Sequence, residues 1–503
     1  MNKILNKACT VFMAIAFLWA GLYMLCSQLL SIHQSEFMDY RIAAVSIILI
    51  LGILYACKKV MDGKNEISLK MAVLILILLA VIPRYFLLHN VSVEQTSDYA
   101  TYLVNSLSIY ENFSVSQDWQ LYFGAIAGNV PIICGIFALG FKLLGASLAV
   151  GLFMNVLFYT GAVVALYFLA LRFTGKNTAF LTAAIYALWP NNICYSVSMS
   201  SEPMYIFFLF SGLALFTYGL QIRGIMLLAS MLLSGAVLGL SQAIRPITVN
   251  FILSIVLVLV FYSNRKTAEN SSHSFKQRLV ILSTLIVAYM ITLWGLGLYT
   301  SKIVPIVSKP SYGWSLFEGS NINTYGQWDP ESSKVLSRVM SEYPLEQVQT
   351  VLLGKGIERI KSYDAPTLIH LLEMKTRNVF GNGDLFNKEL RSYITAQPTL
   401  IKSGSVPMVI LAWGQLSFWL YRMLALYFIY ICFRCMYFIL TMRERENVYR
   451  LFVMILPVCG IMAVHLLLTS IERYNYPAIP IMIMIGMTFM ERYSFIFRKR
   501  MGG

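Results

Sequence analysis

Long apolar segments without a charged residue restrict the fold of this chain more than any other feature. Residues 147–171, 224–241 and 279–300 are three such segments. Each has about 18 residues or more, enough for a helix to cross the hydrocarbon core of a bilayer. Only 13% of the 503 residues are charged, whereas soluble domains average about 25%. The sequence therefore predicts an all-α polytopic membrane protein.

Apolar runs along the whole sequence predict about twelve transmembrane helices. They lie near 8–31, 41–57, 70–88, 147–171, 177–193, 202–220, 224–241, 246–262, 279–300, 406–433, 449–470 and 474–490. If both termini are cytoplasmic, basic clusters at 58–70, 265–278 and 442–450 all fall on the cytoplasmic side, as the positive-inside rule requires. The net charge of +15 is thus spread over short loops and predicts no nucleic-acid partner. We expect a multi-pass protein of the cell membrane.

Two segments are predicted to lie on the outer side of the bundle. Residues 128–145 are apolar, but counting them as a span would invert every later loop and place the basic clusters outside. We interpret them as a helix in the outer membrane interface. Residues 301–405 are polar and far longer than a usual connection. They are predicted to form a folded extracytoplasmic loop or small domain.

Two carboxylates stand at the outer ends of apolar runs in this topology. Asp98, in "SDYATYLVNSLSIYEN", is spaced to share one face of a short helix with Tyr102 and Asn105. The alternative interpretation is a solvated interfacial helix. Glu202 precedes Pro203 at the head of an apolar run, where a carboxylate is also favoured simply as a helix-start residue. The residues alone leave both alternatives open.

Arginines occur on the same outer side, against the usual trend. Arg245 lies in "GLSQAIRPITVNFIL", Arg473 lies in "SIERYNYP", and Arg84 in "VIPRYFLL" is a candidate third. Snorkelling toward the interface is the alternative role for such a side chain. Arginine binds phosphate oxygens bidentately, and a carboxylate can accept a proton from an attacking hydroxyl. The set therefore suits a lipid phosphate whose tail lies in the bilayer.

Several motifs in order resemble one enzyme family. They are the acidic-Tyr motif Asp98, Tyr99 and Tyr102, the stretch from Pro190 to Glu202-Pro203, the Arg245-Pro246 pair, the closing Glu472 to Pro477 segment, and "GWSLFEGSNINTYGQWDPES" in the outer loop. From about residue 68 onward the chain is similar to the C-type (GT-C) membrane glycosyltransferases. It resembles most the family 39 branch of protein O-mannosyltransferases and aminoarabinose transferases.

This resemblance implies an architecture in four parts. They are two additional N-terminal spans (1–67), a GT-C transmembrane core (68–300) with a first outer loop (89–146), the extracytoplasmic loop (301–405) and C-terminal spans (406–503). It also implies that a sugar is transferred, usually with inversion, from a polyprenyl-phosphate donor on the outer face. The acceptor would be a protein, a glycan or a wall polymer.

The resemblance further implies roles for individual residues. Asp98 would be the general base, and Glu202 would replace the second carboxylate that the family often carries where this chain has Tyr99. The donor phosphate would be bound by Arg245, Arg473 and Lys375, with Arg84 as a further candidate, and the substrates would contact Tyr99 and Tyr102. Residue type alone makes Trp314 and Tyr325 of the outer loop candidates for stacking on a sugar ring, and the alternative for these two is a role as membrane-surface anchors. Some relatives use a divalent metal. This sequence has no His-rich or clustered acidic ligand set at these positions, so we predict a reaction without metal or other cofactor.

Two other functions stay open at this point. A polysaccharide polymerase or ligase would depend on arginine and histidine in the outer loop, where His370 is the sole histidine. A lipid-linked sugar flippase or transporter would need ionisable residues along a path through the bilayer. The predicted spans are nearly free of charge at their middles, and His465 is the deepest candidate.

Overall fold

The computed structural model describes residues 2–31, 40–63, 65–261, 274–305, 312–381, 406–442 and 445–501. Within these ranges the regular structure is helical and contains no strand. The helices are α1 (Asn2–Ser31), α2 (Tyr40–Met61), α3 (Leu69–Asn90), α4 (Ser97–Asn112), α5 (Gln117–Ala125), α6 (Val130–Leu144), α7 (Leu148–Ala170), α8 (Lys176–Ala187), α9 (Pro190–Cys194), α10 (Glu202–Gly219), α11 (Ile225–Ile244), α12 (Val249–Phe261), α13 (Phe275–Ile303), α14 (Tyr312–Gly319), α15 (Pro330–Glu342), α16 (Leu345–Lys361), α17 (Ala365–Phe380), α19 (Val406–Leu440), α20 (Arg445–Leu467) and α21 (Ala478–Met501). The predicted all-α polytopic membrane fold is confirmed.

Seven of the described helices are long and apolar enough to cross a membrane: α1, α3, α7, α11, α13, α19 and α20. The other predicted spans overlap shorter or more polar helices, so the count of about twelve spans stays a prediction. The seven helices leave many large apolar side chains exposed, such as Leu78, Ile82 and Phe86 on α3. Exposed apolar surface on this scale is what a lipid-facing bundle requires.

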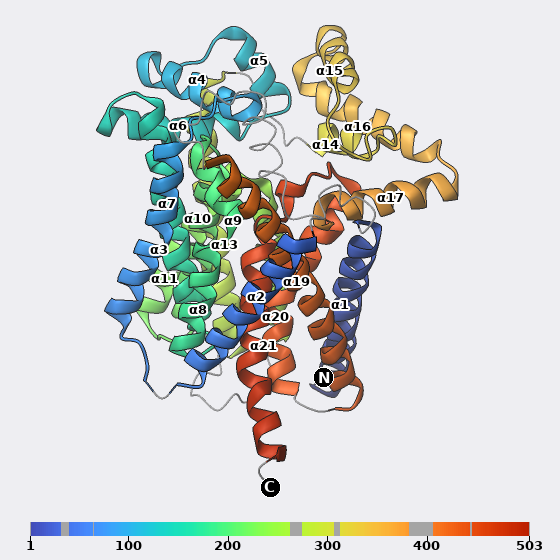
Figure 1. Ribbon diagram of the computed structural model, residues 1–503. Coiled ribbons are helices and arrows are strands. Elements are labelled where there is room, and N and C mark those ends of the chain that lie inside the picture. Colours follow the sequence, from blue (N-terminus) through green and yellow to red (C-terminus); the bar gives the residue numbers. More distant parts are fainter. Residues whose placement is uncertain are drawn as a thin grey trace.

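The bundle has two unlike ends (Figure 1). Helices α4, α5 and α6 and helices α14 to α17 cover one end, and the first residues of α1 and the last residues of α21 lie at the other. The apolar segment predicted as an interfacial helix forms α6. At 15 residues it is shorter than a membrane span, and it packs beside α4 and α7.

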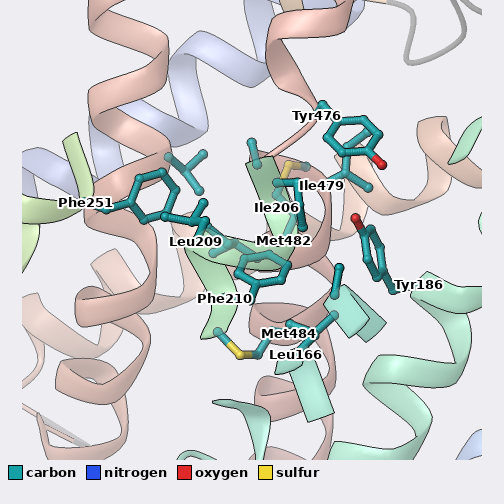
Figure 2. Packing of buried hydrophobic residues seen from close by; sticks show 14 of the residues in the cluster. Leu166, Tyr186, Ile206, Leu209, Phe210, Phe251, Tyr476, Ile479, Met482 and Met484 are labelled. Atoms are coloured by element: carbon teal, nitrogen blue, oxygen red, sulfur yellow. The ribbon is translucent and has the colours of Figure 1, made fainter. Parts of the chain in front are cut away.

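The interior of the bundle is closely packed. Figure 2 shows Leu166 of α7, Phe210 of α10, Phe251 of α12 and Met482 of α21 meeting in one cluster. Two helices approach each other closely at Gly235 on α11, where a Cβ atom would lie 2.2 Å from the Leu285 carbonyl oxygen of α13. Small residues permit such close helix contacts in membranes. The packed helices fix the positions of their ends.

The outer helices α14, α15 and α16 have a small core of their own. It contains Phe317, Leu336, Val339, Val348 and Leu352, together with Ala125 and Ile126 from the end of α5. The Gln349 side chain donates a 2.7 Å hydrogen bond to the Ala125 carbonyl oxygen. The two outer segments are therefore joined to each other above the bundle. Residues 382–405 of the predicted outer loop lie outside the described residues.

Candidate functional site

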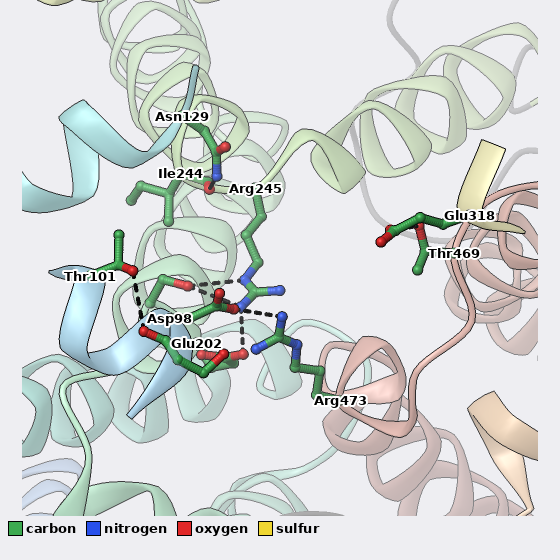
Figure 3. A network of polar contacts seen from close by, with 11 residues as sticks. Asp98, Thr101, Asn129, Glu202, Ile244, Arg245, Glu318, Thr469 and Arg473 are labelled. Carbon is green, nitrogen blue, oxygen red and sulfur yellow. Dashed lines mark hydrogen bonds and ion pairs between the residues drawn. The ribbon is translucent and has the colours of Figure 1, made fainter. Parts of the chain in front are cut away.

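Four segments that are distant in sequence converge at the covered end of the bundle (Figure 3). Asp98 lies in the first turn of α4, Glu202 is the first residue of α10, Arg245 follows the last residue of α11, and Arg473 lies in the 3₁₀ turn η6 (Glu472–Asn475). The first turn of a helix favours a carboxylate. Pro246 directly follows Arg245 and helps to end α11, because the residue before a proline disfavours helical backbone. The loop charges predicted that these four residues share one side of the membrane, and in the structure they lie close together.

Arg245 is anchored to the start of α10. Its guanidinium forms an ion pair with the Glu202 carboxylate and donates from Nε and Nη2 to the Ser201 hydroxyl at 3.2 and 3.0 Å. The Arg245 side chain is 16% exposed, and Glu202 is buried. Nη1 of Arg245 makes no hydrogen bond within the described part of the chain. The Nε and Nη2 edge of the guanidinium is thus held by Ser201 and Glu202, and Nη1 is left to bind another acceptor.

The end of α11 is itself held by α6. The Asn129 side chain donates a 2.9 Å hydrogen bond to the carbonyl oxygen of Ile244, the residue before Arg245 (Figure 3). Asn129 stands just before the first residue of α6. The end of α11 is therefore held by α6, and the Arg245 side chain that follows it is held by the start of α10.

Arg473 pairs with Asp98. Its Nη2 lies 2.6 Å from Oδ2 of Asp98, and the two side chains are 22% and 41% exposed. The Nε of Arg473 is buried and has no hydrogen-bond partner among the described residues. Figure 3 shows the Arg473 and Arg245 guanidinium groups lying next to each other. Each arginine therefore binds a different carboxylate, although the two cations are neighbours.

The ion pair controls the charge state of Asp98. Partial burial of Asp98 would raise its pKa, but the positive charge of Arg473, with a smaller contribution from Arg245, lowers it below the usual value. Asp98 is consequently an ionised carboxylate at neutral pH. The four side chains together carry two positive charges and can carry two negative charges.

A third acidic residue, Glu318, was missed by sequence reasoning. It extends from α14 with its carboxyl group turned toward the arginines (Figure 3), and it is only 4% exposed. Its Oε2 accepts a 3.4 Å hydrogen bond from Thr469, whereas Oε1 has no partner within the described ranges. Burial raises the pKa of Glu318 to about 8. The residue lies in a loop segment that the sequence singled out, but nothing in that segment distinguishes a buried glutamate from a solvated one.

The predicted substrate-binding aromatic residues lie in two places. Tyr102 is buried and Tyr99 half-buried, both on α4 beside Asp98. Trp314 packs at 6.0 Å from the Phe317 ring inside the small outer core. Tyr325 contacts His370 edge-on at 5.6 Å between ring centres. These positions leave a substrate-binding role for the four residues a prediction.

Lys375 and Arg84 contact backbone rather than the two ion pairs. Lys375 is fully buried and donates to the carbonyl oxygens of Gly319 at 2.6 Å and Leu467 at 3.2 Å. Arg84 is buried and donates to two carbonyl oxygens, those of Ala80 at 2.6 Å and Ala187 at 3.1 Å. Its guanidinium also stacks 3.5 Å from the centre of the Tyr159 ring. Both residues join helices here, and their predicted binding of donor phosphate stays a prediction.

His465, the deepest ionisable candidate for a transport path, also has local partners. Its Nδ1 lies 2.8 Å from the Thr469 carbonyl oxygen, and its ring stacks on Tyr474 with ring centres 4.7 Å apart. Thr469 in turn donates to Glu318. His465 therefore lies behind the Glu318 side of the site.

The acidic, histidine and cysteine residues of the described ranges do not form a group of three or more that could hold a metal ion. Asp98 and Glu202 of this site each contact an arginine. The arrangement can hold an anion between two guanidinium groups and place a carboxylate beside it.

Comparison with known proteins gives a likeness in structure alone. No family profile and no curated protein sequence matches the chain. The chain is similar to the Archaeoglobus fulgidus oligosaccharyltransferase in complex with Zn and sulfate (13% identity, TM-score 0.44, 84% of this chain and 49% of that one). It is also similar to the same enzyme tethered to an acceptor peptide containing the NVT sequon (11%, 0.43, 92% and 50%). A third similar structure holds an inhibitory peptide and a dolichol-phosphate (13%, 0.40, 85% and 50%). The chain spans about half the length of these structures.

Proposed function

We propose that this protein is a GT-C glycosyltransferase that moves a sugar from a polyprenyl-phosphate donor to an acceptor hydroxyl at the covered end of the bundle. The observation that carries the proposal is the pair of neighbouring arginines, each anchored by its own carboxylate. Arg245 lies near the middle of the sequence, after α11, and Arg473 lies near its C-terminal end, in η6. The covered end is proposed to be the extracytoplasmic face.

A lipid phosphate fits this end of the bundle. The exposed apolar sides of the spanning helices suit a polyprenyl chain. The guanidinium donors that bind no other group among the described residues, Nη1 of Arg245 and Nε of Arg473, suit a phosphate headgroup. Arginine stays charged and presents its donors in a fork that matches phosphate oxygens. Because both side chains are already held by Glu202 and Asp98, little rotamer freedom is lost when the anion binds.

Asp98 is proposed as the general base of the reaction. The acceptor oxygen forms a bond to the anomeric carbon while the bond from that carbon to the phosphate oxygen breaks on the opposite face, which inverts the configuration. The electron pair of the broken bond stays on the polyprenyl phosphate, and the hydroxyl proton passes to Asp98. Asp98 is ionised and 41% exposed, so it is available to an incoming hydroxyl. Glu202 remains bound to Arg245 and keeps that guanidinium in place.

The test is transfer in vitro by purified full-length protein, with a panel of labelled polyprenyl-phosphate sugars and candidate acceptors. Asp98→Asn should reduce turnover about 10²–10⁴-fold, the usual contribution of a positioned base, while still binding donor. Asp118→Asn is the matched control, because Asp118 is an exposed acid in the first turn of the neighbouring helix α5. It should keep wild-type turnover.

The products separate this proposal from the other functions. A transferase releases polyprenyl phosphate and labels the acceptor, whereas a flippase changes only the side of the membrane on which the donor lies. Full activity in Asp98→Asn would mean that the base is another group, and Glu202 would be tested next. Donor movement without release of polyprenyl phosphate would replace the transferase proposal with a transport role.

A further inference from the structure

Glu318 differs from the other two acidic residues of the site because it forms no ion pair with any cation in the described part of the chain. Asp98 and Glu202 each contact an arginine, whereas the Glu318 carboxyl group accepts a hydrogen bond from the Thr469 hydroxyl. Its second oxygen, Oε1, is buried and lacks a partner among the described residues. A buried polar atom without a partner costs free energy, so its presence calls for an explanation.

The fold holds Glu318 firmly in this position. The Lys375 ammonium donates to the carbonyl oxygen of Gly319, the next residue. The Arg359 guanidinium donates to the carbonyl oxygen of Phe317, the preceding residue. α14 is thus fixed on both sides of Glu318 by α16 and α17. The backbone that carries Glu318 is therefore held in place, and its side chain is buried.

Charge at the site determines which form of Glu318 is compatible with a bound phosphate. Arg245 and Arg473 supply two positive charges, and Asp98 and Glu202 can balance them before any substrate arrives. A bound phosphate adds negative charge, which increases further when the sugar leaves. An ionised Glu318 would repel this anion, whereas a neutral carboxyl group has a hydroxyl that can donate a hydrogen bond to it.

We propose that Glu318, in its neutral form, donates a hydrogen bond to the phosphate that Arg245 and Arg473 bind. This inference rests on the proposed function and adds a third phosphate-binding group, from the outer helix α14. During transfer the proton stays on Glu318, and the shortened hydrogen bond stabilises the charge that collects on the departing phosphate oxygen. α14 therefore contributes directly to recognition of the phosphate.

The surroundings of Glu318 favour the neutral form at neutral pH. Burial raises its pKa to about 8, and Asp329 acts in the same direction, whereas Thr469 and Arg473 act against it. The titratable and charged groups around Glu318 are Asp98, Tyr122, Asp329, Arg359, Lys375, His465, Arg473 and Tyr474. A bound phosphate would raise the pKa of Glu318 further. In the protein without phosphate the neutral group should persist to about pH 8 and be lost above it, and a bound phosphate should extend this range to higher pH.

The experiment measures binding of a short polyprenyl phosphate, farnesyl phosphate, to the full-length protein in detergent between pH 6.5 and 9.5. Wild-type affinity should fall about tenfold or more between pH 7 and pH 9.5. Glu318→Gln keeps a neutral hydrogen-bond donor of the same size, so it should bind within about threefold of wild type at pH 7 and lose this alkaline decline. Glu318→Ala should bind about 10- to 100-fold more weakly at pH 7, the usual effect of losing a hydrogen bond to a charged group.

Matched controls isolate Glu318. Glu331→Gln changes an exposed glutamate on α15 and should reproduce the wild-type pH dependence. Ionisation of farnesyl phosphate and of Lys375 is common to all variants and cancels in the comparison. Each variant is first checked for wild-type elution and helicity. Both Glu318 variants keep the two arginines. Glu318→Gln removes the ability to ionise but keeps a hydrogen-bond donor, whereas Glu318→Ala removes both.

The outcomes distinguish this inference from the proposed function. An alkaline decline in Glu318→Gln equal to that of wild type, or wild-type affinity in Glu318→Ala at pH 7, would overturn the role of Glu318 alone. Binding that is unchanged in Arg245→Gln and Arg473→Gln, or absent from wild type at every pH, would overturn the phosphate site and this inference with it. Weakened binding in both arginine variants, together with a flat profile in Glu318→Gln, supports both.

Discussion

Glu318 is expected to reduce the stability of the folded protein, and Glu318→Gln should recover that stability. The carboxyl group has an ordinary pKa of 4.5 and a folded-state pKa of about 8. Between these values the folded protein keeps a proton that the unfolded chain releases, so the free energy of unfolding falls as pH rises through this window. Below about pH 4.5 both states are protonated and the loss disappears.

The size of the effect follows from the same window. Each pH unit is worth about 1.4 kcal/mol, so the cost of the carboxyl group is about 3 kcal/mol at pH 7 and reaches about 5 kcal/mol above pH 8. Because Glu318 is only 4% exposed, solvent screens this cost little. Glutamine keeps an oxygen that can accept from Thr469 and has no charge to desolvate, so the variant should be more stable by about these amounts.

Thermal unfolding of the purified protein in one detergent, from pH 5 to pH 9, provides the measurement. The midpoint of Glu318→Gln should match wild type near pH 5 and exceed it by several degrees at pH 8.5. Glu331→Gln, at an exposed position of α15, should follow wild type throughout. A difference between Glu318→Gln and wild type that is equal at pH 5 and pH 8.5 would show that Glu318 is not held neutral, and the reasoning would be wrong.

Three further outcomes are expected. Arg473→Gln should raise the pKa of Asp98, because Arg473 is the main group that lowers it. In a pH–rate profile at saturating donor, the loss of activity at acid pH should then begin at a higher pH in the variant than in wild type. An unchanged profile would mean that Asp98 is not the base in the reaction. Gly319→Ala should lower the thermal unfolding midpoint, because its Cβ would lie 2.5 Å from the Leu468 carbonyl carbon. The control Gly354→Ala on α16, where a Cβ meets nothing within 4 Å, should be neutral or stabilising by about 0.5–1 kcal/mol. Equal midpoints in the two variants would contradict the close packing of α14 on α20. Transfer activity should survive EDTA followed by exhaustive dialysis, and restoration by added Mg²⁺ or Mn²⁺ after a loss would establish a metal requirement.

The helical membrane fold and the grouping of four residues of the candidate site could be predicted from the sequence for a simple physical reason. A charged side chain at the end of an apolar run is conspicuous, and the loop charges predict which ends share a side. Asp98, Glu202, Arg245 and Arg473 were chosen on that basis, and their contacts agree with it. The partner of each arginine could not be predicted, because the pairing depends on how the helix ends pack.

Glu318 and Lys375 show what the sequence does not reveal about the outer segment. Both lie in a polar region with many charged residues, and only the tertiary structure makes them buried. The sequence did not predict that the Lys375 ammonium donates to two carbonyl oxygens, and its binding of phosphate stays a prediction. Glu318 was overlooked although it is buried beside the arginines. In a polar segment, residue type alone carries little information about burial.

The two ion pairs differ in the order in which the chain can assemble them. Glu202 and Arg245 lie at facing ends of α10 and α11, which follow each other directly, so a single helical hairpin can form their contact soon after it enters the membrane. Asp98 must wait for Arg473, which follows α20, and until then its carboxylate has to remain in contact with water. The Glu202–Arg245 pair can thus form early, while a single hairpin inserts. The Asp98–Arg473 pair can form only late, when nearly all the helices are in place.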